Sequence, residues 1–389
     1  MNSFFSHKKH RVAALLLALV LCLCPLTALA AEESTEDDLH IIAVGDVMCL
    51  AGQLSAARVS GGYNFRPVFS QVKPIFDEAD LVIGNLETVV HHAPYTAANQ
   101  GGNPKLIAPE AFIDAAKFAG FDFFATANNH SMDRGVEGLL STIEVLDRKG
   151  IPHAGTYASA EERANTPILS VDGTKIAILS YTQLINGGTP RITEDYLVNY
   201  NRFIADTIEE DKRTVEADIA AVKERGAELV LVYIHWGTEN TTVLTSRQTE
   251  TAQFLADAGA DVILGSHPHV LQGSEYLTSA DGRQVFVSYS LGNFVSSMPR
   301  ATNLDNMLLH ITVSRDAQGK AYVKAIDYMS TQTGNVSGNR WSVIPCELGQ
   351  QNDAFSSQHR SMARSAERTK ETVGTAIEPK ARFAFMRGG

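Results

Sequence analysis

Short apolar runs alternate with stretches of helical periodicity along most of this chain. In the helical stretches, apolar side chains recur every three or four positions, which is the spacing of one buried helix face. They predict helices over 110–119, 135–149, most of 196–225, and 246–258. The shorter apolar runs predict buried strands at 39–44, 80–83, 121–125, 228–234, 260–264 and 284–289.

Two further places predict antiparallel pairing. Residues 168–171 and 175–180 flank the turn at 172–174, and an Asp-Gly turn between two apolar runs is typical of a β-hairpin. Residues 307–313 and 322–328 form a second predicted antiparallel pair. Strands that alternate with helices favour parallel pairing, so both kinds of pairing must occur together. We therefore expect an α/β fold with two packed mixed sheets and helices on the outside.

The first 31 residues are predicted to serve export and not to form part of the fold. Basic residues gather at 7–11, an apolar run covers 12–30, and Ala28-Leu-Ala30 fits a small-residue cleavage site. The apolar run is also long enough to span a bilayer, so residues 1–31 are a signal peptide or an N-terminal membrane anchor. We expect a linker at 32–38, one domain at 39–349, and a basic C-terminal tail or peripheral helix at 350–389.

Composition narrows the classes of function. The 389 residues carry a formal net charge of −11, which does not suit a general nucleic-acid-binding protein, so no nucleic-acid partner is expected. Cys49 and Cys346 are the cysteines that follow the export segment, and two cysteines do not make a disulfide scaffold. The fold must therefore be held by its apolar core.

Polar side chains follow five predicted strands, at positions where core packing alone would place apolar residues. They are Asp46, Asn85, Glu87, Asn129, His130, His235, His267 and His269. Ligands of α/β folds bind at the carboxyl ends of strands, and residues two apart on extended backbone, such as His267 and His269, point to the same side. Taken alone, Asp46 could be a helix or turn cap, and His235 could be a structural histidine of the interior. Together they predict a site for one or two divalent ions of Mn, Zn or Fe.

The order of these motifs resembles the calcineurin-like metallophosphoesterase superfamily. Within that superfamily, it is most similar to the poly-γ-glutamate capsule-biosynthesis (CapA/PgsA-type) family. The segments that carry the resemblance, in family order between about residues 39 and 330, are 43–48, 85–87, 127–133, 235–239, 265–272 and 289–294. The resemblance implies a four-layer α/β/β/α sandwich of two mixed sheets.

The resemblance also implies roles for individual residues. The implied metal ligands are Asp46, Asn129, His235, His267 and His269. His130 would protonate a leaving group, and Asp133 either orients His130 through a hydrogen bond or caps the following helix. Two positions depart from the phosphoesterase pattern, because Met48 replaces a histidine and Asn85 replaces a bridging aspartate. Glu87, two residues beyond Asn85 on the same strand face, is the substitute carboxylate.

The resemblance and the export signal together imply an exported capsule-biosynthesis protein, extracellular or attached to the outer face of the cytoplasmic membrane. Its expected partners are poly-γ-glutamate or a related anionic polymer and membrane-bound polymer-synthesis proteins. Two alternatives stay open. One is a secreted metal-dependent hydrolase of phosphoesters. Met48 and Asn85 argue against it, because they depart from the phosphoesterase pattern. The other is a polymer-binding scaffold that holds no metal. Glu239 is expected either to act near the site or to be a solvated loop acid.

Overall fold

The computed structural model describes residues 38–91, 106–188 and 192–386. The predicted signal or anchor and residues 32–37 of the predicted linker lie outside these ranges. None of the helices in the described ranges combines the length and the apolar character that crossing a bilayer requires.

The first sheet contains the N-terminal strand at its centre. Its order is β17-β16-β15-β1-β4-β7-β8, and β18 pairs with β16. The strands β1, β4, β7 and β8 are parallel, whereas β15, β16 and β17 add antiparallel neighbours. Their bounds are β17 Asn339–Pro345, β16 Ala321–Val336, β15 Asp305–Arg315, β1 Leu39–Val47, β4 Leu81–Leu86, β7 Phe123–Ala125, β8 His153–Ala154 and β18 Glu378–Pro379.

The second sheet has the order β13-β14-β12-β11-β10-β9. Its four middle strands are parallel, and the edge strands β9 and β13 are antiparallel to their neighbours. The bounds are β13 Ser274–Thr278, β14 Gln284–Ser288, β12 Val262–Ser266, β11 Leu229–His235, β10 Thr174–Thr182 and β9 Ile168–Val171. The predicted hairpin is therefore confirmed as β9 and β10, and the second predicted antiparallel pair as β15 and β16.

The remaining elements are short pairs of strands and helices. The strand pairs are β2 Arg58–Val59 with β3 Gly62–Tyr63, and β5 Val89–His91 with β6 Ile107–Pro109. The helices are α1 Ala51–Ala57, α2 Arg66–Phe69, α3 Lys73–Phe76, α4 Glu110–Ala119, α5 Gly135–Lys149, α6 Ala160–Ala164, α7 Ile208–Glu224, α8 Ser246–Ala258, α9 Ala301–Leu304, α10 Cys346–Gln350 and α11 His359–Val373. A 3-10 helix spans Asp353–Gln358.

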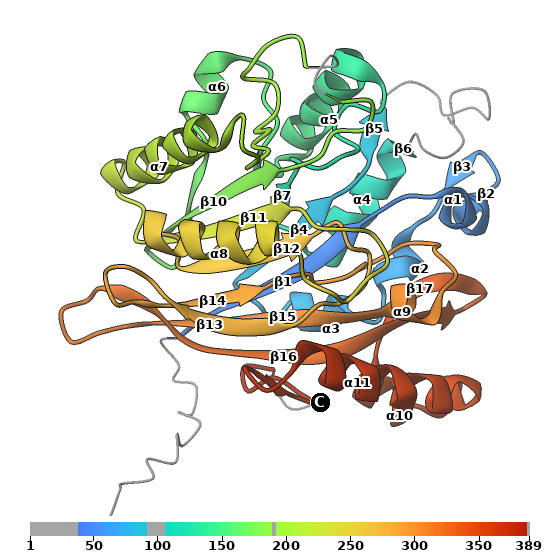
Figure 1. Cartoon of the computed structure of the whole chain (residues 1–389). Helices are drawn as coiled ribbons and strands as arrows, with labels where there is room; N and C mark the ends of the chain where they lie inside the picture. The colour runs from blue at the N-terminus through green and yellow to red at the C-terminus, as the bar shows by residue number, and fades with distance from the viewer. Residues whose placement is uncertain (1–37, 92–105, 189–191, 387–389) are drawn as a thin grey trace, which may run out of the picture. The chain divides into compact units, whose positions relative to one another are not determined.

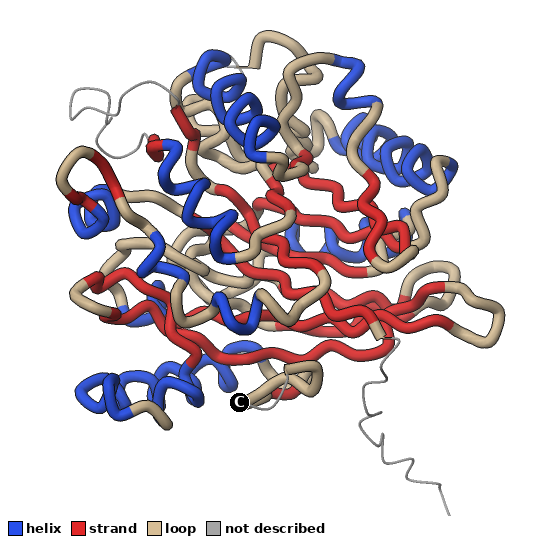
Figure 2. The backbone as a smooth tube through the Cα atoms, turned by 180° about the vertical axis from the view of Figure 1, so that it is seen from behind, coloured by secondary structure: helices blue, strands red, loops and turns tan. Residues whose placement is uncertain are grey.

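The two sheets pack face to face through one apolar core. Ile41 and Ile83 of the first sheet belong to the same buried cluster as Leu231 and Leu264 of the second. The hydroxyl of Tyr233, on β11, donates hydrogen bonds to two carbonyl oxygens of the first sheet. Separate clusters join the outer face of each sheet to its helices, α4 on one side and α7 and α8 on the other. Helices therefore form the outer layers (Figures 1 and 2), which confirms the four-layer α/β/β/α sandwich.

The predicted helix over 196–225 was wrong in its first part, because α7 begins only at Ile208. The backbone N–H of Asn199 donates to the carbonyl of Gly155, and that of Asn201 donates to the carbonyl of Thr182 on β10. These bonds to distant strands and loops replace the bonds that a helix would make. Tertiary pairing thus overrides local periodicity.

The C-terminal segment packs along the first sheet. Helix α11 buries Met362, Thr369 and Val373, which lie on one helical face, and its neighbouring strand is β16. The guanidinium of Arg368 forms two hydrogen bonds of 2.6 Å with the carboxylate of Asp305 at the start of β15. This helix covers the first sheet on the side of β16 (Figure 1).

Candidate metal centre

The predicted polar residues gather where parallel strands of both sheets end. Asp46 lies near the end of β1, beside Asn85 of β4 in register, and Glu87 directly follows β4. His235 is the last residue of β11 and pairs in register with Ser266 of β12. His267 and His269 follow β12, and Asn129 and His130 lie in the loop after β7. The described structure thus brings every predicted site residue to one edge of the sandwich.

Two glycines allow the strands to approach each other at this edge. A β-carbon on Gly45 would lie 2.0 Å from the carbonyl oxygen of Gly292, and one on Gly265 would lie 2.0 Å from that of Tyr289. The N–H of Asp46 donates to the carbonyl of Gly292 at 2.9 Å. The register of β1 against β4 shifts between Ala43 and Asp46. The glycines therefore fix the position of Asp46 and of residues 267–269, which we call the histidine turn.

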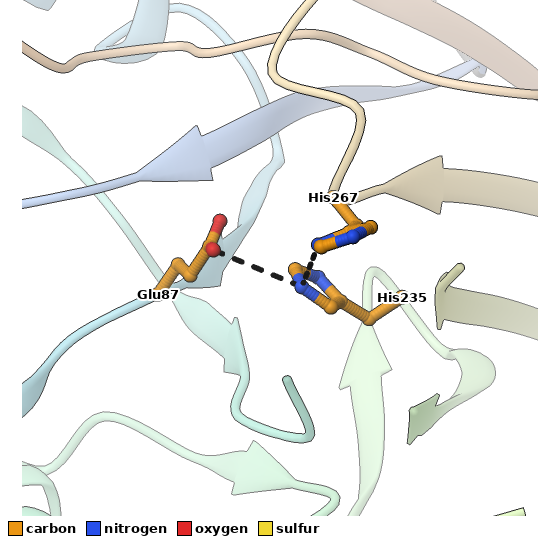
Figure 3. A group of neighbouring side chains, drawn as sticks. All are labelled: Glu87, His235 and His267. Carbon is orange, nitrogen blue, oxygen red and sulfur yellow. Dashed lines mark hydrogen bonds and ion pairs between the residues drawn. The ribbon is translucent and has the colours of Figure 1, made fainter. Parts of the chain in front are cut away.

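Glu87 lies at the centre of the group. Its side chain is wholly buried, and within the described ranges neither carboxylate oxygen has a hydrogen-bond partner. The Nε2 atoms of His130, His235 and His269 lie 3.9, 3.7 and 3.8 Å from its Oε1 atom. Figure 3 shows that Glu87 and His267 both approach the ring of His235, and each contacts its Nε2 atom. An unpaired buried carboxylate surrounded by imidazoles is the donor set that a divalent metal ion would satisfy.

Two overlapping sets of side chains meet the spacing that a metal ion needs. Asp46, Glu87 and His269 form one set, and Glu87, His235 and His267 form the other, with ligand atoms within 4.8 Å of one another in each set. Every member of both sets is buried. Since Glu87 belongs to both, it occupies the position of a shared carboxylate. The residues present therefore fit a centre for a divalent metal ion.

The histidine turn does not have the extended backbone that the sequence led us to expect. The φ angles are 95° at His267 and 58° at His269, both in the left-handed region. Such angles cost non-glycine residues about 1–3 kcal/mol each unless the surroundings hold them. The side chain of Asn303 donates to the carbonyl of His269 at 2.8 Å, and Asn293 contacts its ring at 2.9 Å. The two imidazoles converge through this turn and not through strand alternation.

Burial and neighbouring charges shift the proton affinities of the centre. Burial, together with the charge of Asp46, raises the pKa of Glu87 well above its usual range. Burial and the neighbouring histidines lower the pKa of His235 well below its ordinary value and that of His267 to about 3. Burial also acts to lower the pKa of His269, but contact with Asp46 outweighs it and raises that pKa. His235 and His267 are therefore neutral, as metal ligands must be.

His130 and Asp133 form a hydrogen-bonded pair beside the centre. The Nδ1 atom of His130 lies 2.6 Å from the carboxylate of Asp133, which also accepts the backbone N–H of Leu106. The helix cap at this point is Arg134, so the alternative that Asp133 caps α5 was wrong. Asp133 instead orients the His130 ring and leaves its Nε2 atom facing the centre.

The two asparagines of the predicted ligand set make different contacts. The side-chain amide of Asn85 donates to Asp46 at 2.8 Å, so it holds a carboxylate of the centre in place. The side-chain oxygen of Asn129 lies 3.0 Å from Nε2 of His235. Both asparagines are buried at this edge. Asn85 therefore positions a neighbour, while Asn129 directs its oxygen toward the imidazoles.

Three contacting residues were missed by the sequence interpretation. Asn128 donates to the side-chain oxygen of Asn85 at 3.2 Å, and Ser266 contacts Nδ1 of His235 at 2.9 Å. Asn186 lies 3.4 Å from Nδ1 of His130. Asn128 and Ser266 stand inside recognised motifs, so their place in the sequence could have marked them. Asn186 lies in a loop far along the chain and carries no such signal.

The comparisons with known proteins point to one family of bacterial proteins. Residues 40–298 match the family model described as "Bacterial capsule synthesis protein PGA_cap". The PGA biosynthesis protein CapA of Bacillus subtilis (strain 168) is 29% identical over 297 residues, covering 75% of this chain and 72% of that protein. The capsule biosynthesis protein CapA of Bacillus anthracis is 29% identical over 279 residues, covering 70% of this chain and 63% of that protein. The match therefore spans less than two thirds of the second relative.

Solved structures with a related arrangement are more distant. The NAD nucleotidase of Haemophilus influenzae aligns with a TM-score of 0.45 and 16% identity, covering 90% of this chain and 58% of that one. A purple acid phosphatase from yellow lupin seeds aligns with a TM-score of 0.36 and 9% identity, covering 80% of this chain and 54% of that one.

Proposed function

Because this chain belongs to the bacterial capsule synthesis protein family, we propose that it acts in making or exporting poly-γ-glutamate or a related anionic cell-surface polymer. One observation carries the proposal: the matched region, residues 40–298, contains every residue of the centre. The two Bacillus relatives bear names of capsule and PGA biosynthesis, and a Mycobacterium tuberculosis relative is a probable polyglutamine synthesis accessory protein. Capsule biosynthesis is thus the pathway that these relatives support.

The protein works at the outer face of the cytoplasmic membrane in this proposal. The basic residues at 7–11 and the apolar run at 12–30 support export, because they have the order of a signal peptide or an N-terminal anchor. At that place the chain would meet the polymer as it leaves the membrane-bound enzymes that extend it. Those enzymes are its proposed partners.

A divalent metal ion completes the centre in this proposal. Asp46, Glu87, His235, His267 and His269 would hold it, since they form the buried sets with suitable spacing. Such an ion would supply Lewis acidity toward a phosphoryl or acyl oxygen and lower the pKa of a bound water. The protein itself supplies neutral imidazoles and a centre that excludes bulk water.

The pair of His130 and Asp133 would hold a proton for the same chemistry. Contact with the carboxylate at 2.6 Å favours the tautomer with its proton on Nδ1 of His130. The opposite nitrogen, Nε2, faces the centre and lies 3.9 Å from Oε1 of Glu87. It is therefore placed to accept a proton from a substrate group or return one.

This pair also favours a second candidate function, metal-dependent hydrolysis of a phosphoester. The amide of Asn85 argues against it, because a neutral side chain occupies the place of a bridging carboxylate and donates to Asp46. A scaffold without metal is the third candidate, and the unpaired carboxylate of Glu87 argues against that one. Capsule biosynthesis with a metal-holding centre agrees with both observations.

Deletion and complementation in the source bacterium test the proposal. Loss of the gene is expected to remove or shorten the cell-surface polymer, and the wild-type chain should restore it. Glu87→Gln should fail to restore it, whereas Glu250→Gln, an exposed change on α8, should succeed. Normal polymer in the deletion strain would overturn the capsule role. Phosphodiester turnover by the purified protein, with normal polymer, would favour the hydrolase instead.

A further inference from the structure

The loop between β11 and α8 is bonded to the histidine turn and to its neighbours at several points. The N–H of Asn240 donates to the carbonyl of Pro268 at 2.7 Å, inside the histidine turn. The side chain of Asn303 bridges the two segments, because it donates to the side chain of Asn240 at 3.1 Å and to the carbonyl of His269 at 2.8 Å. The loop and the histidine turn therefore form one rigid unit.

Contacts also hold the residues on both sides of Glu239 in this loop. Gly237 has a φ of 85°, and a β-carbon there would lie 2.8 Å from the side chain of Gln248. That glutamine donates to Gln272 at 2.8 Å, and Gln272 in turn donates to the carbonyl of Thr241 at 3.0 Å. Glu239 lies between these anchors, so the backbone position of Glu239 is held against the centre.

The carboxylate of Glu239 faces the histidines from the solvent side. Glu239, His267 and His269 offer ligand atoms within 4.8 Å of one another, and Glu239 is the exposed member of this set. No hydrogen bond or ion pair to another described residue holds its carboxylate. It is therefore free to bind an ion that the two histidines contact from within.

The chemistry of the centre leaves room for this ligand. Met48 offers only a thioether sulfur where the phosphoesterase pattern has an imidazole, so one nitrogen ligand of that pattern is missing. Asp46, Glu87 and Glu239 approach the imidazoles from different elements, and only Glu239 comes from the open side. A ligand on that side would close the coordination of an ion that the buried residues hold incompletely.

We propose that Glu239 is a metal ligand of this centre, binding from the solvent side together with His267 and His269. The inference rests on the metal-holding centre of the proposed function. The sequence left Glu239 open between a role near the site and a solvated loop acid, and its position beside His267 and His269 favours the first.

Metal titration of the purified, chelator-treated full chain tests this proposal. Isothermal titration with Zn²⁺ or Mn²⁺ should show that Glu239→Gln binds at least about tenfold more weakly than wild type. Glu250→Gln, the matched exposed change, should bind as wild type does. The absorption bands of Co²⁺ bound to the protein should also shift in Glu239→Gln, because one oxygen ligand is lost.

The outcomes separate this inference from the function beneath it. Wild-type protein that binds metal, with Glu239→Gln binding within twofold and an unchanged Co²⁺ spectrum, would overturn the role of Glu239 alone. A folded wild-type chain that binds none of the three metals would overturn the metal centre and this inference together. Far-UV circular dichroism of each variant shows that a loss of binding is not a loss of folding.

Discussion

Replacing Glu87 with glutamine should have opposite effects on stability with and without metal. In the metal-free protein, this wholly buried carboxylate has no hydrogen-bond partner among the described residues. Among the described residues that approach it, His235 and His267 have lowered pKa values, and the Nδ1 atom of His269 pairs with Asp46 at 3.3 Å. The raised pKa of Glu87 means that the folded protein binds a proton there that the unfolded chain releases.

The size of this effect follows from proton linkage. The ordinary pKa of a glutamate is 4.5, and each pH unit above it costs the folded state about 1.4 kcal/mol while Glu87 stays protonated. A buried carboxylate that stays charged without a partner instead costs the folded state several kcal/mol. A buried glutamine amide left without partners costs about 1–3 kcal/mol. Glu87→Gln should therefore stabilise the metal-free protein by about 1–3 kcal/mol, and more at pH 8 than at pH 6.

Bound metal should make the wild type more stable than Glu87→Gln. An ion at one hundred times its dissociation constant stabilises the wild type by about 2.7 kcal/mol, and the variant lacks the shared ligand. The assay is urea unfolding at pH 7.5, once with EDTA and once with Zn²⁺ or Mn²⁺, with Glu250→Gln as the control. A variant less stable than wild type in EDTA would refute the electrostatic argument. Equal stabilisation of both proteins by metal would refute the placement of Glu87 at the ion.

Three further predictions concern the core and the neighbours of the centre. Leu231→Ala should lower the unfolding free energy by about 2–5 kcal/mol in urea, since Leu231 is buried between the sheets; a change below about 1 kcal/mol would contradict that packing. His267 binds fewer protons when folded, because burial lowers its pKa from 6.5 to about 3. The unfolding free energy of the metal-free wild type should therefore fall by up to about 1.4 kcal/mol per pH unit below pH 6.5. In acid titrations, the unfolding free energy of His267→Asn should fall less steeply with pH. Equal slopes for the two proteins would contradict this prediction. Asp133→Asn should cost about 1.5–3 kcal/mol in urea unfolding through its lost charged bonds to His130, and an unchanged midpoint would count against that pair.

The elements that the sequence predicted best are those with two independent signals. Helices α4, α5 and α8 have a helical apolar period and a glycine in the left-handed conformation directly after them, so their C-terminal ends could be placed. The region before α7 has the apolar periodicity of a helix but no residue that caps a helix there. Its backbone instead bonds to Gly155 and Thr182, which lie far away in the sequence. Periodicity alone cannot reveal such a competing partner.

The gathering of site residues was predictable for a topological reason, while their exact geometry was not. Parallel strands end at one edge, so polar residues after several apolar runs must come together. The left-handed backbone at His269 is held by contacts from Asn293 and Asn303, which are separated from the turn in sequence. The approach of Glu239 depends likewise on a loop clamped by the same asparagine. Such contacts between loops leave no periodic trace in the sequence.

Asn85 and Glu87 are best understood as a single change in the charge of the centre. Asp46 and Glu87 are both wholly buried here, and a third carboxylate at position 85 would add another buried negative charge at a cost of several kcal/mol. The amide of Asn85 instead donates to Asp46 at 2.8 Å, so it attracts where an aspartate would repel. Glu87, two residues later, places its carboxylate among the histidines. The amide at position 85 thus stabilises Asp46, while the buried charge of Glu87 is one that a divalent ion could balance.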